Sequence, residues 1–290
     1  MPGSIRASDT RRRARRLVRT PAFLAGAGLV ALMLLLSAAA PLVAPYDYAA
    51  APKFQGNRPP SHAHLLGTDQ QGHDILSRIL AGGRVTLAIA LAATAASIFI
   101  GVAVGLASAL TNRWADGLLM RFTDMVYAFP GLLLALALAA IFERRSVFTI
   151  LLALGLVGWV SVARVMRAEC LRLRESDFVT AARALGASRW RIALRHVLPN
   201  TFSSLIVVAT LLVASNVLSE AGLSFLGLGV ADPPSWGMQL AEARDTFRIH
   251  PYQAIFPGLA IAATVLGFNL LGDGLAHALD PRRASGRTRA

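Results

Sequence analysis

"VTLAIALAATAASIFIGVAVGLASAL", residues 85–110, is an apolar stretch without a single charged side chain. A helix needs about 20 largely apolar residues to cross about 30 Å of hydrocarbon, so this stretch is long enough to span a membrane. Five other stretches meet or approach the same requirement: 21–44, 118–141, 146–163, 201–219 and 254–271. The sequence therefore predicts an all-α, polytopic membrane protein with six transmembrane helices.

The composition agrees with a membrane-embedded helical bundle. The chain has 290 residues, of which 55% are hydrophobic and 16% are charged, and its mean hydropathy is +0.54. Soluble globular proteins carry about 25% charged residues. A net charge of +13 would suggest a nucleic-acid partner in a soluble protein. Here the arginines flank apolar stretches and have no aromatic residues interleaved for base stacking, so we expect no nucleic-acid partner.

The arginines also predict the orientation of the spans. If the N-terminus is cytoplasmic, 21 of the 29 basic residues fall on the inside, as the positive-inside rule requires. Both termini are then cytoplasmic. The predicted organisation is a basic cytoplasmic tail (1–20), a first transmembrane helix (21–44), an extracytoplasmic loop with an amphipathic helix (45–84), a five-helix core (85–275) that includes a cytoplasmic loop (164–200), and a cytoplasmic tail (276–290).

Two apolar stretches have other interpretations. The first span resembles a signal peptide with small residues at 37–40, but its apolar part is longer than the about 7–15 residues typical of such signals, so we expect it to be retained. The stretch 221–231 is too short to span and is expected to be interfacial, re-entrant or packed inside the protein.

No motif for chemistry occurs in the chain. The only lysine, Lys53, follows Pro52 and precedes Phe54, so it cannot belong to a P-loop. Cys170 is the only cysteine, and no nucleophile–base pair is evident. We therefore expect no catalytic residue, metal site or cofactor in this chain, and any ATP and Mg²⁺ must be bound by partner subunits. The group Asp69, His73 and Asp74 has a metal-ligand interpretation, but a turn followed by an amphipathic helix on the outer face is favoured.

The longest polar segment on the inside contains "TAARALGASRWRIALRHVLPN", residues 180–200. Asp177 is expected to cap a helix over 178–185, and Gly186 suits the left-handed residue that ends it. Ser188 is expected to cap a second helix that reaches Val197, and Pro199 to bend the chain as it enters the membrane. From the residues alone, this segment is either a knob that a partner receives or a solvated connector.

This segment resembles the signature loop of permease subunits of bacterial ABC importers. The matching positions are Thr180-Ala181-Ala182, Gly186, Ile192 and Leu198-Pro199. Four further blocks, 64–87, 120–139, 219–240 and 256–281, resemble the second permease of dipeptide, oligopeptide and nickel importers. The resemblance covers about 22–281 and implies the type I ABC importer permease (MetI-like) fold. Thr180 stands where the family often has glutamate, so a role for that carboxylate is not carried over.

The resemblance implies a division of labour among subunits. The cytoplasmic loop would be a coupling helix docked on one of two ATP-binding subunits. The other implied partners are a homologous second permease, an extracytoplasmic substrate-binding protein near 221–252, membrane lipid, and a di- or oligopeptide substrate, with nickel or glutathione as alternatives. The implied location is the bacterial inner membrane. The coupling candidates are Thr180, Ala181, Ala182, Ala184, Leu185, Gly186, Ala187 and Trp190.

Three residues are candidates for the translocation pathway. Asp124 lies inside the third span and either lines the pathway or forms an interfacial ion pair with Arg121. Pro130 is expected to kink that span. Glu220, at the end of the fifth span, either lines the pathway or supports packing against the glycine-rich residues that follow. A secondary transporter driven by an ion gradient is the rival from another class, but the most central spans carry no midplane charge and no internal repeat is evident.

Overall fold

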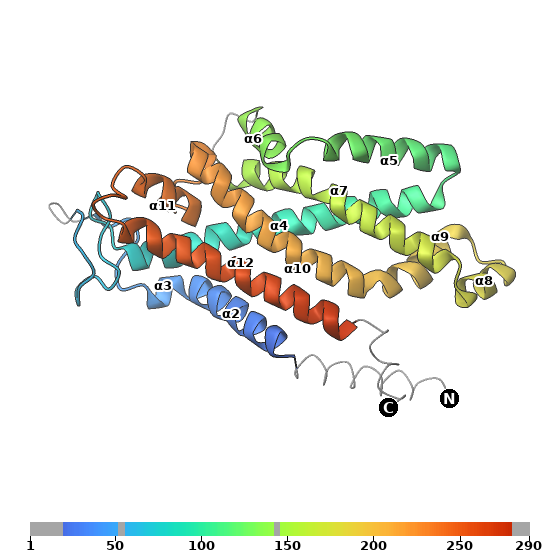
Figure 1. The fold of residues 1–290 in the computed structure, drawn as a ribbon, viewed down its shortest axis with the longest axis horizontal. Helices are drawn as coiled ribbons and strands as arrows, with labels where there is room; N and C mark the ends of the chain where they lie inside the picture. The colour runs from blue at the N-terminus through green and yellow to red at the C-terminus, as the bar shows by residue number, and fades with distance from the viewer. Residues whose placement is uncertain (1–19, 52–55, 142–145, 280–290) are drawn as a thin grey trace.

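The computed structural model describes residues 20–51, 56–141 and 146–279, and within these ranges it contains helices and no β-strand (Figure 1). Most of the two predicted basic tails, and Lys53, lie outside the described residues. The helices are α2 (Pro21–Ala38), α3 (Ala40–Val43), α4 (Ile75–Leu110), α5 (Arg113–Tyr127), α6 (Gly131–Ile141), α7 (Val147–Arg174), α8 (Asp177–Ala184), α9 (Arg189–Ile192), η1 (Ala193–Val197), α10 (Leu198–Leu223), η2 (Ser224–Leu228), α11 (Trp236–Ala243) and α12 (Tyr252–Leu279).

Five helical segments in the described part of the chain are long and apolar enough to cross a membrane, and a bent pair makes a sixth candidate. The five are α2, α4, α7, the continuous segment Arg189–Leu228 and α12. The six-helix, all-α prediction is confirmed in this form. The third span differs from the expected kinked helix, because α5 and α6 meet at an angle of 87°. Pro130 lies in this break, where its missing N–H and the steric limits on the residue before it end α5.

The second span is longer than the sequence pattern suggested. Helix α4 begins at Ile75, where the Asp74 carboxylate accepts a hydrogen bond from the Ser77 backbone N–H at 2.8 Å. The amphipathic helix expected on the outer face is therefore the first part of α4 and not a separate element. The helix continues through Gly82 and Gly83. Both are packed tightly against other segments of the protein, where a Cβ would collide, so the lack of a side chain serves this packing.

Helices α4 and α7 lie along each other in the middle of the bundle (Figure 1). Gly101 and Gly105, four residues apart, make this close approach possible. A Cβ on Gly101 would lie 2.5 Å from the Cβ of Val162, and one on Gly105 would lie 2.7 Å from the backbone oxygen of Ala163. Small residues at this spacing allow two helix backbones to meet in lipid, where packing replaces the hydrophobic effect.

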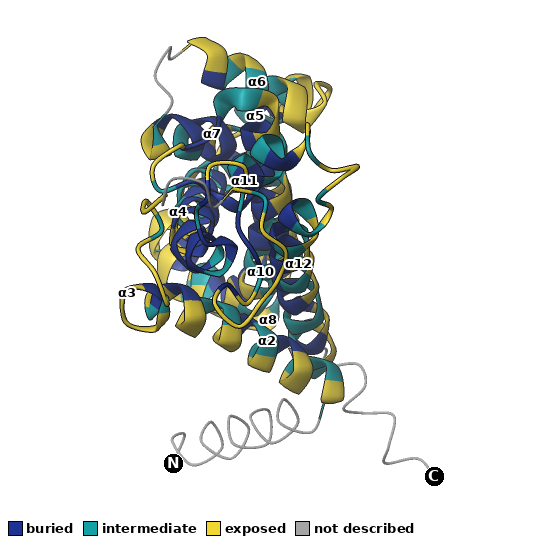
Figure 2. Cartoon of the chain, turned by 90° about the vertical axis from the view of Figure 1, so that its left-hand side faces the viewer, coloured by how far each residue is buried: buried dark blue, intermediate teal, exposed yellow. Residues whose placement is uncertain are grey.

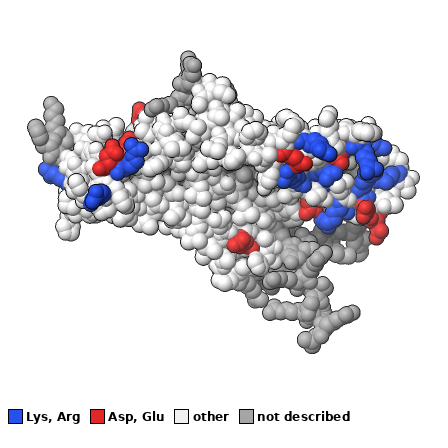
Figure 3. All heavy atoms as spheres, turned by 45° about the horizontal axis from the view of Figure 1, so that its top comes forward, with Lys and Arg blue, Asp and Glu red and all other residues white. Residues whose placement is uncertain are grey.

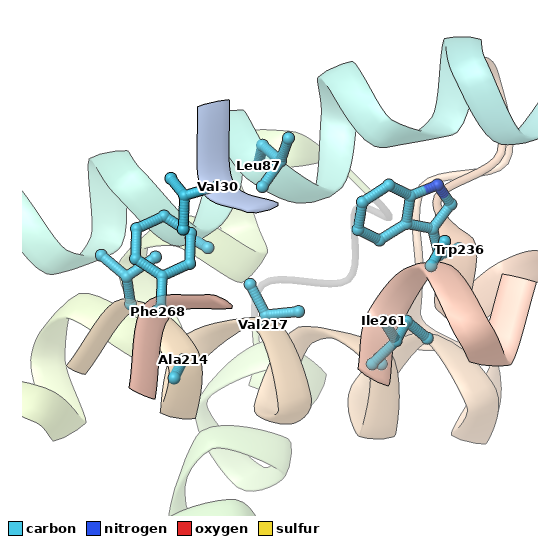
Figure 4. Packing of buried hydrophobic residues seen from close by; sticks show 11 residues of the cluster. Val30, Leu87, Ala214, Val217, Trp236, Ile261 and Phe268 are labelled. Atoms are coloured by element: carbon cyan, nitrogen blue, oxygen red, sulfur yellow. The ribbon is translucent and has the colours of Figure 1, made fainter. Parts of the chain in front are cut away.

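A cluster of apolar side chains joins α2, α4, α10, α11 and α12 (Figure 4). The cluster contains at least one residue from each of these helices: Val30 of α2, Leu87 of α4, Val217 of α10, Trp236 of α11 and Phe268 of α12. The Trp236 indole N–H donates to the backbone oxygen of Ile79 at 2.8 Å, so this buried ring is satisfied. Seen from the α11 end, buried residues are concentrated in α4, α7, α10 and α12, whereas α2 and α6 show exposed faces (Figure 2).

The segment Arg189–Leu228 includes two π-helical turns, and its backbone leaves the helical conformation at Gly227, in the second of them. Pro199 follows the first turn, η1. Since proline has no N–H to donate to the preceding turn, the wider hydrogen-bond spacing of η1 accommodates it, and the expected change of direction into the membrane is taken up inside a continuous helix. The stretch 221–231 completes α10 and forms η2, where Gly227 has φ of +87° and ends the helix.

Candidate functional site

The α8–α9 corner, which we define as residues 177–192, projects from one end of the bundle (Figure 1). Helix α8 follows directly after α7. Ser176, with extended backbone, precedes its first residue, so Asp177 is the first helical residue and not the cap that the sequence suggested. The Thr180 hydroxyl donates to the Ser176 backbone oxygen at 3.3 Å, and Thr180 is exposed. The position therefore faces solvent, with no acidic side chain.

Gly186 forms the turn between the two short helices, as predicted. Its φ is +79°, in the left-handed region that favours glycine. The Gly186 N–H donates to the Arg183 oxygen at 3.0 Å, and the Ala187 N–H donates to the Ala182 oxygen at 3.1 Å. These two bonds form a Schellman motif, which satisfies carbonyl groups at the end of α8.

Ser188 starts the next helix, also as predicted. Its hydroxyl accepts a hydrogen bond from the Arg191 N–H at 3.3 Å. Because α9, η1 and α10 are continuous, the corner is joined directly to α7 on one side and to the 40-residue segment Arg189–Leu228 on the other. A displacement of the corner is therefore applied directly to two spans.

The corner presents apolar side chains outward. Leu185 is 88% exposed and Trp190 is 60% exposed, while Val179 and Ile192 are buried and attach the corner to the bundle. Of the remaining predicted residues, Thr180, Ala181, Ala184 and Gly186 are exposed, whereas Ala182 and Ala187 are half-buried and pack against the bundle. The four alanines of the corner therefore do not form one surface: two face the solvent and two face the bundle.

Phe178 was not predicted as part of this surface, although it is exposed near the start of α8. No local signal marked it. Adjacent helix positions point about 100° apart, so the sequence allows both Phe178 and Val179 to lie toward the bundle, and the structure buries only Val179. An exposed Phe, Leu and Trp within 13 residues of chain are unusual for a solvated connector and are typical of a docking surface.

Arginines gather at this end of the molecule (Figure 3). Arg167 holds Asp116 by two hydrogen bonds, of 2.7 Å from Nε and 2.6 Å from Nη2, which tie α7 to α5. The hydroxyl of Ser204 donates to Glu169 at 2.7 Å and ties α10 to α7. The base of the corner is thus held by polar contacts between spans.

Asp124 has a different partner from the one expected. Its carboxylate forms an ion pair with Arg164 of α7 at 2.7 Å, and not with Arg121 on its own helix. The guanidinium of Arg164 also lies 4.0 Å from the centre of the Tyr127 ring. The carboxylate of Asp124 is more than half exposed, so this is an accessible pair on the surface of the single chain.

Glu220 is completely buried near the C-terminal end of α10. Its Oε1 accepts a hydrogen bond from the Ser224 hydroxyl at 2.6 Å, and Ser224 accepts one from Ser235 at 3.1 Å. Ser235 caps α11. Of the two interpretations, support for packing against the following turn fits this conformation. Asp124, Pro130 and Glu220 are not brought together into one site.

A network of polar contacts holds the segment that precedes α4. Asp69 accepts from the backbone N–H groups of residues 71–73 and contacts both His73 and the buried Arg78. Asp74 caps α4 and contacts His64 at 2.9 Å. Both carboxylates take part in turns and ion pairs, which agrees with the favoured interpretation of this segment as a turn followed by a helix. The described residues contain no group of three or more potential ligands arranged for a metal.

Two further contacts connect this segment to the region around α11. Arg78 also forms an ion pair with Glu242 of α11 at 2.8 Å. The Tyr48 hydroxyl donates to Asp232 at 3.0 Å, and this hydrogen bond raises the pKa of Tyr48 above its usual value. The segment before α4 and the segment around α11 therefore form one cross-linked layer at the α11 end of the bundle, which the proposed orientation below makes the outer layer.

Comparison with known proteins identifies the architecture. Residues 97–285 match the family described as the inner membrane component of binding-protein-dependent transport systems, and residues 8–60 match the N-terminal transmembrane domain of oligopeptide transport permease C. The chain belongs to this transport-component family. It is a multi-pass permease of an ABC importer, as the resemblance implied.

Individual relatives cover nearly the whole chain. The glutathione transport system permease protein GsiD of Pectobacterium atrosepticum is 40% identical over 93% of this chain and 90% of its own length. The GsiD protein of Escherichia coli O157:H7 is 40% identical over 92% of this chain and 89% of its own. The oligopeptide transport system permease protein OppC of Bacillus subtilis is 36% identical over 88% of this chain and 83% of its own.

Proposed function

We propose that this permease forms one half of a translocation pathway for peptides, and that its α8–α9 corner docks on a separate ATP-binding subunit. The observation that carries the docking role is the outward presentation of Leu185 and Trp190 on a glycine-ended corner attached directly to two spans. Large apolar side chains at the centre of an interface supply most of its binding energy. A rigid corner of this kind transmits movement without chemistry in this chain.

The proposed transport system contains further subunits. A homologous, distinct permease supplies the other half of the pathway, and two ATP-binding subunits bind ATP and Mg²⁺ on the cytoplasmic side. A substrate-binding protein docks outside near residues 221–252, where α11 and the cross-linked outer layer lie. The location is the bacterial inner membrane with both termini cytoplasmic. In support, α2 begins and α12 ends toward the arginine-rich end that carries α8 (Figures 1 and 3).

Di- and oligopeptides are the proposed substrates. The oligopeptide permease named above supports this class, and the relatives named for glutathione transport make that tripeptide the second candidate. Uptake into cells that carry the complete transporter should be measured for peptides, glutathione and nickel ions with each candidate binding protein supplied in turn. Uptake of nickel ions alone would refute the peptide assignment.

The docking role is tested by co-purification of the ATP-binding subunits with the tagged permease. Leu185→Glu and Trp190→Ala should each reduce this recovery by about 30-fold or more, since an interface tryptophan of this kind contributes about 2 kcal/mol or more. Trp114→Ala is the matched control, because Trp114 is 90% exposed at the start of α5 and lies outside the corner. The second permease should be recovered equally from all variants. Unchanged recovery of the ATP-binding subunits in both corner variants would refute docking at this surface.

A further inference from the structure

A cavity of about 240 Å³ lies behind the α8–α9 corner, between it and the ends of α4 and α7. This volume is several times the about 30 Å³ that one water molecule occupies in the liquid, so the cavity has room for a chemical group larger than a water. Leu106 and Leu110, from the last turns of α4, form part of its lining, as do the buried Val179 and Ile192 of the corner. One side of the cavity is therefore apolar and continues the surface of a membrane span.

Three arginines line the same cavity. Arg174 ends α7, Arg183 lies in the last turn of α8, and Arg189 begins α9. No aspartate or glutamate is among the described residues that line it, and none of the three arginines forms an ion pair with a described residue. Three cations from three elements thus converge on one cavity without an anionic partner.

Arg189 lies at a helix end where a positive charge is unfavourable unless an anion compensates it. Cations are favourable near helix C-termini, which accounts for Arg174 and Arg183, but an arginine at a helix N-terminus opposes the helix dipole. Arg189 is at the N-terminus of the long segment Arg189–Leu228. A bound anion would compensate both the arginines and this helix end, and arginine is well suited to phosphate because it offers paired donors.

We propose that this cavity binds an anionic phospholipid, whose phosphate is held by Arg174, Arg183 and Arg189 and whose acyl chains start along Leu106 and Leu110. The apolar wall decides between a lipid and an acidic protein segment. Leu106 and Leu110 belong to a helix that is long and apolar enough to span a membrane, so this wall continues an apolar span surface, which suits acyl chains better than the side chains of an acidic protein segment. Basic pockets between spans on the cytoplasmic side are suited to anionic lipid headgroups.

The test uses the full-length permease in nanodiscs of zwitterionic lipid with increasing amounts of phosphatidylglycerol, followed by native mass spectrometry to count retained anionic lipids. The triple variant R174Q/R183Q/R189Q should lose the most tightly retained lipid. Each arginine near the surface is worth about a fivefold change in affinity, so the three together should weaken binding on the order of 100-fold. The matched control, R113Q/R191Q/R195Q, removes the same charge from exposed positions that do not line the cavity.

Cys170 gives an independent measurement, because the chain's only cysteine lines this cavity and is buried. Labelling of Cys170 by a small maleimide should be slower in anionic than in zwitterionic nanodiscs, and the triple variant should remove this difference. Equal lipid retention by the triple and control variants would overturn the proposal. Protection of Cys170 by inorganic phosphate alone would assign the cavity to a free anion. Protection only in the presence of the ATP-binding subunits would assign it to a protein segment, and either result would refute a lipid site.

Discussion

Replacing Gly186 by valine tests whether the geometry of the α8–α9 corner couples the permease to its motor. A Cβ added at Gly186 would meet no atom within 4 Å, so the substitution causes no collision. The whole effect comes from φ of +79°, which a β-branched residue adopts only with strain. Residues held in such regions cost about 1–3 kcal/mol, and valine lies at the upper end of this range.

This strain is opposed locally by few interactions. The corner is closed by the two hydrogen bonds of the Schellman motif, from the N–H groups of Gly186 and Ala187. Each bond contributes about 0.5–1.5 kcal/mol net, so a cost of about 3 kcal/mol is comparable to both together. We therefore expect the docking geometry to be populated about 100-fold less often in the Gly186→Val variant.

The assay is substrate-stimulated ATP hydrolysis by the assembled transporter in proteoliposomes. Gly186→Val should abolish the stimulated rate and leave the amount of permease in the membrane unchanged, because the substituted site is exposed and makes no packing contact. Gly186→Asn is the matched control, since asparagine tolerates left-handed backbone and should retain most of the stimulated rate. Equal, normal stimulation in the Val and Asn variants would refute the role of the corner.

Three other sets of substitutions test the bundle. Gly105→Ala should destabilise the purified protein by about 1–3 kcal/mol in thermal unfolding, because its Cβ would press on the α7 backbone, whereas Gly117→Ala, with open space around it, should be neutral or stabilising by up to about 1 kcal/mol. Glu220→Ala should cost about 2–3 kcal/mol, because it removes the acceptor of the Ser224 hydroxyl proton and leaves that buried donor without a partner, and Glu220→Gln should recover most of this loss; equal losses would contradict the hydrogen-bond argument. A double-mutant cycle of Arg167→Gln and Asp116→Asn should give a coupling of about 1 kcal/mol that falls in 1 M salt, and a salt-independent coupling would show that charge is not its source.

The sequence was sufficient to predict the features that depend on local chemistry. Apolar length predicted the spans, and Gly186 and Ser188 predicted the end of one short helix and the start of the next. Both signals act within a few residues, because a left-handed glycine and a serine cap satisfy backbone groups of their own turn.

The sequence was not sufficient to predict features that depend on contacts between residues far apart in the chain. Asp124 was expected to pair with the residue three positions earlier, but Arg164 lies 40 residues away and reaches it from another helix. The start of α4 depends in the same way on Asp74, whose turn is held by His64, and on close packing around Gly82. The 87° break at Pro130 exceeds the kink that a proline alone suggests, and no local pattern sets its size.

The continuous segment Arg189–Leu228 connects the two functional ends of the chain. At about 1.5 Å per residue, its 40 residues extend about 60 Å, from the proposed docking corner to the turn where Ser224 meets Glu220 and Ser235. A rigid-body movement applied at Arg189 must therefore appear at the outer layer or be absorbed by bending along the segment. The two π-helical turns, η1 and η2, are the places where its hydrogen-bond pattern departs from an α-helix, and they lie close to the two ends. The α-helical α10 between them has an uninterrupted hydrogen-bond pattern and is consequently the part best suited to transmit movement, and the flanking turns are the parts best suited to convert it into rearrangement of the corner and of α11.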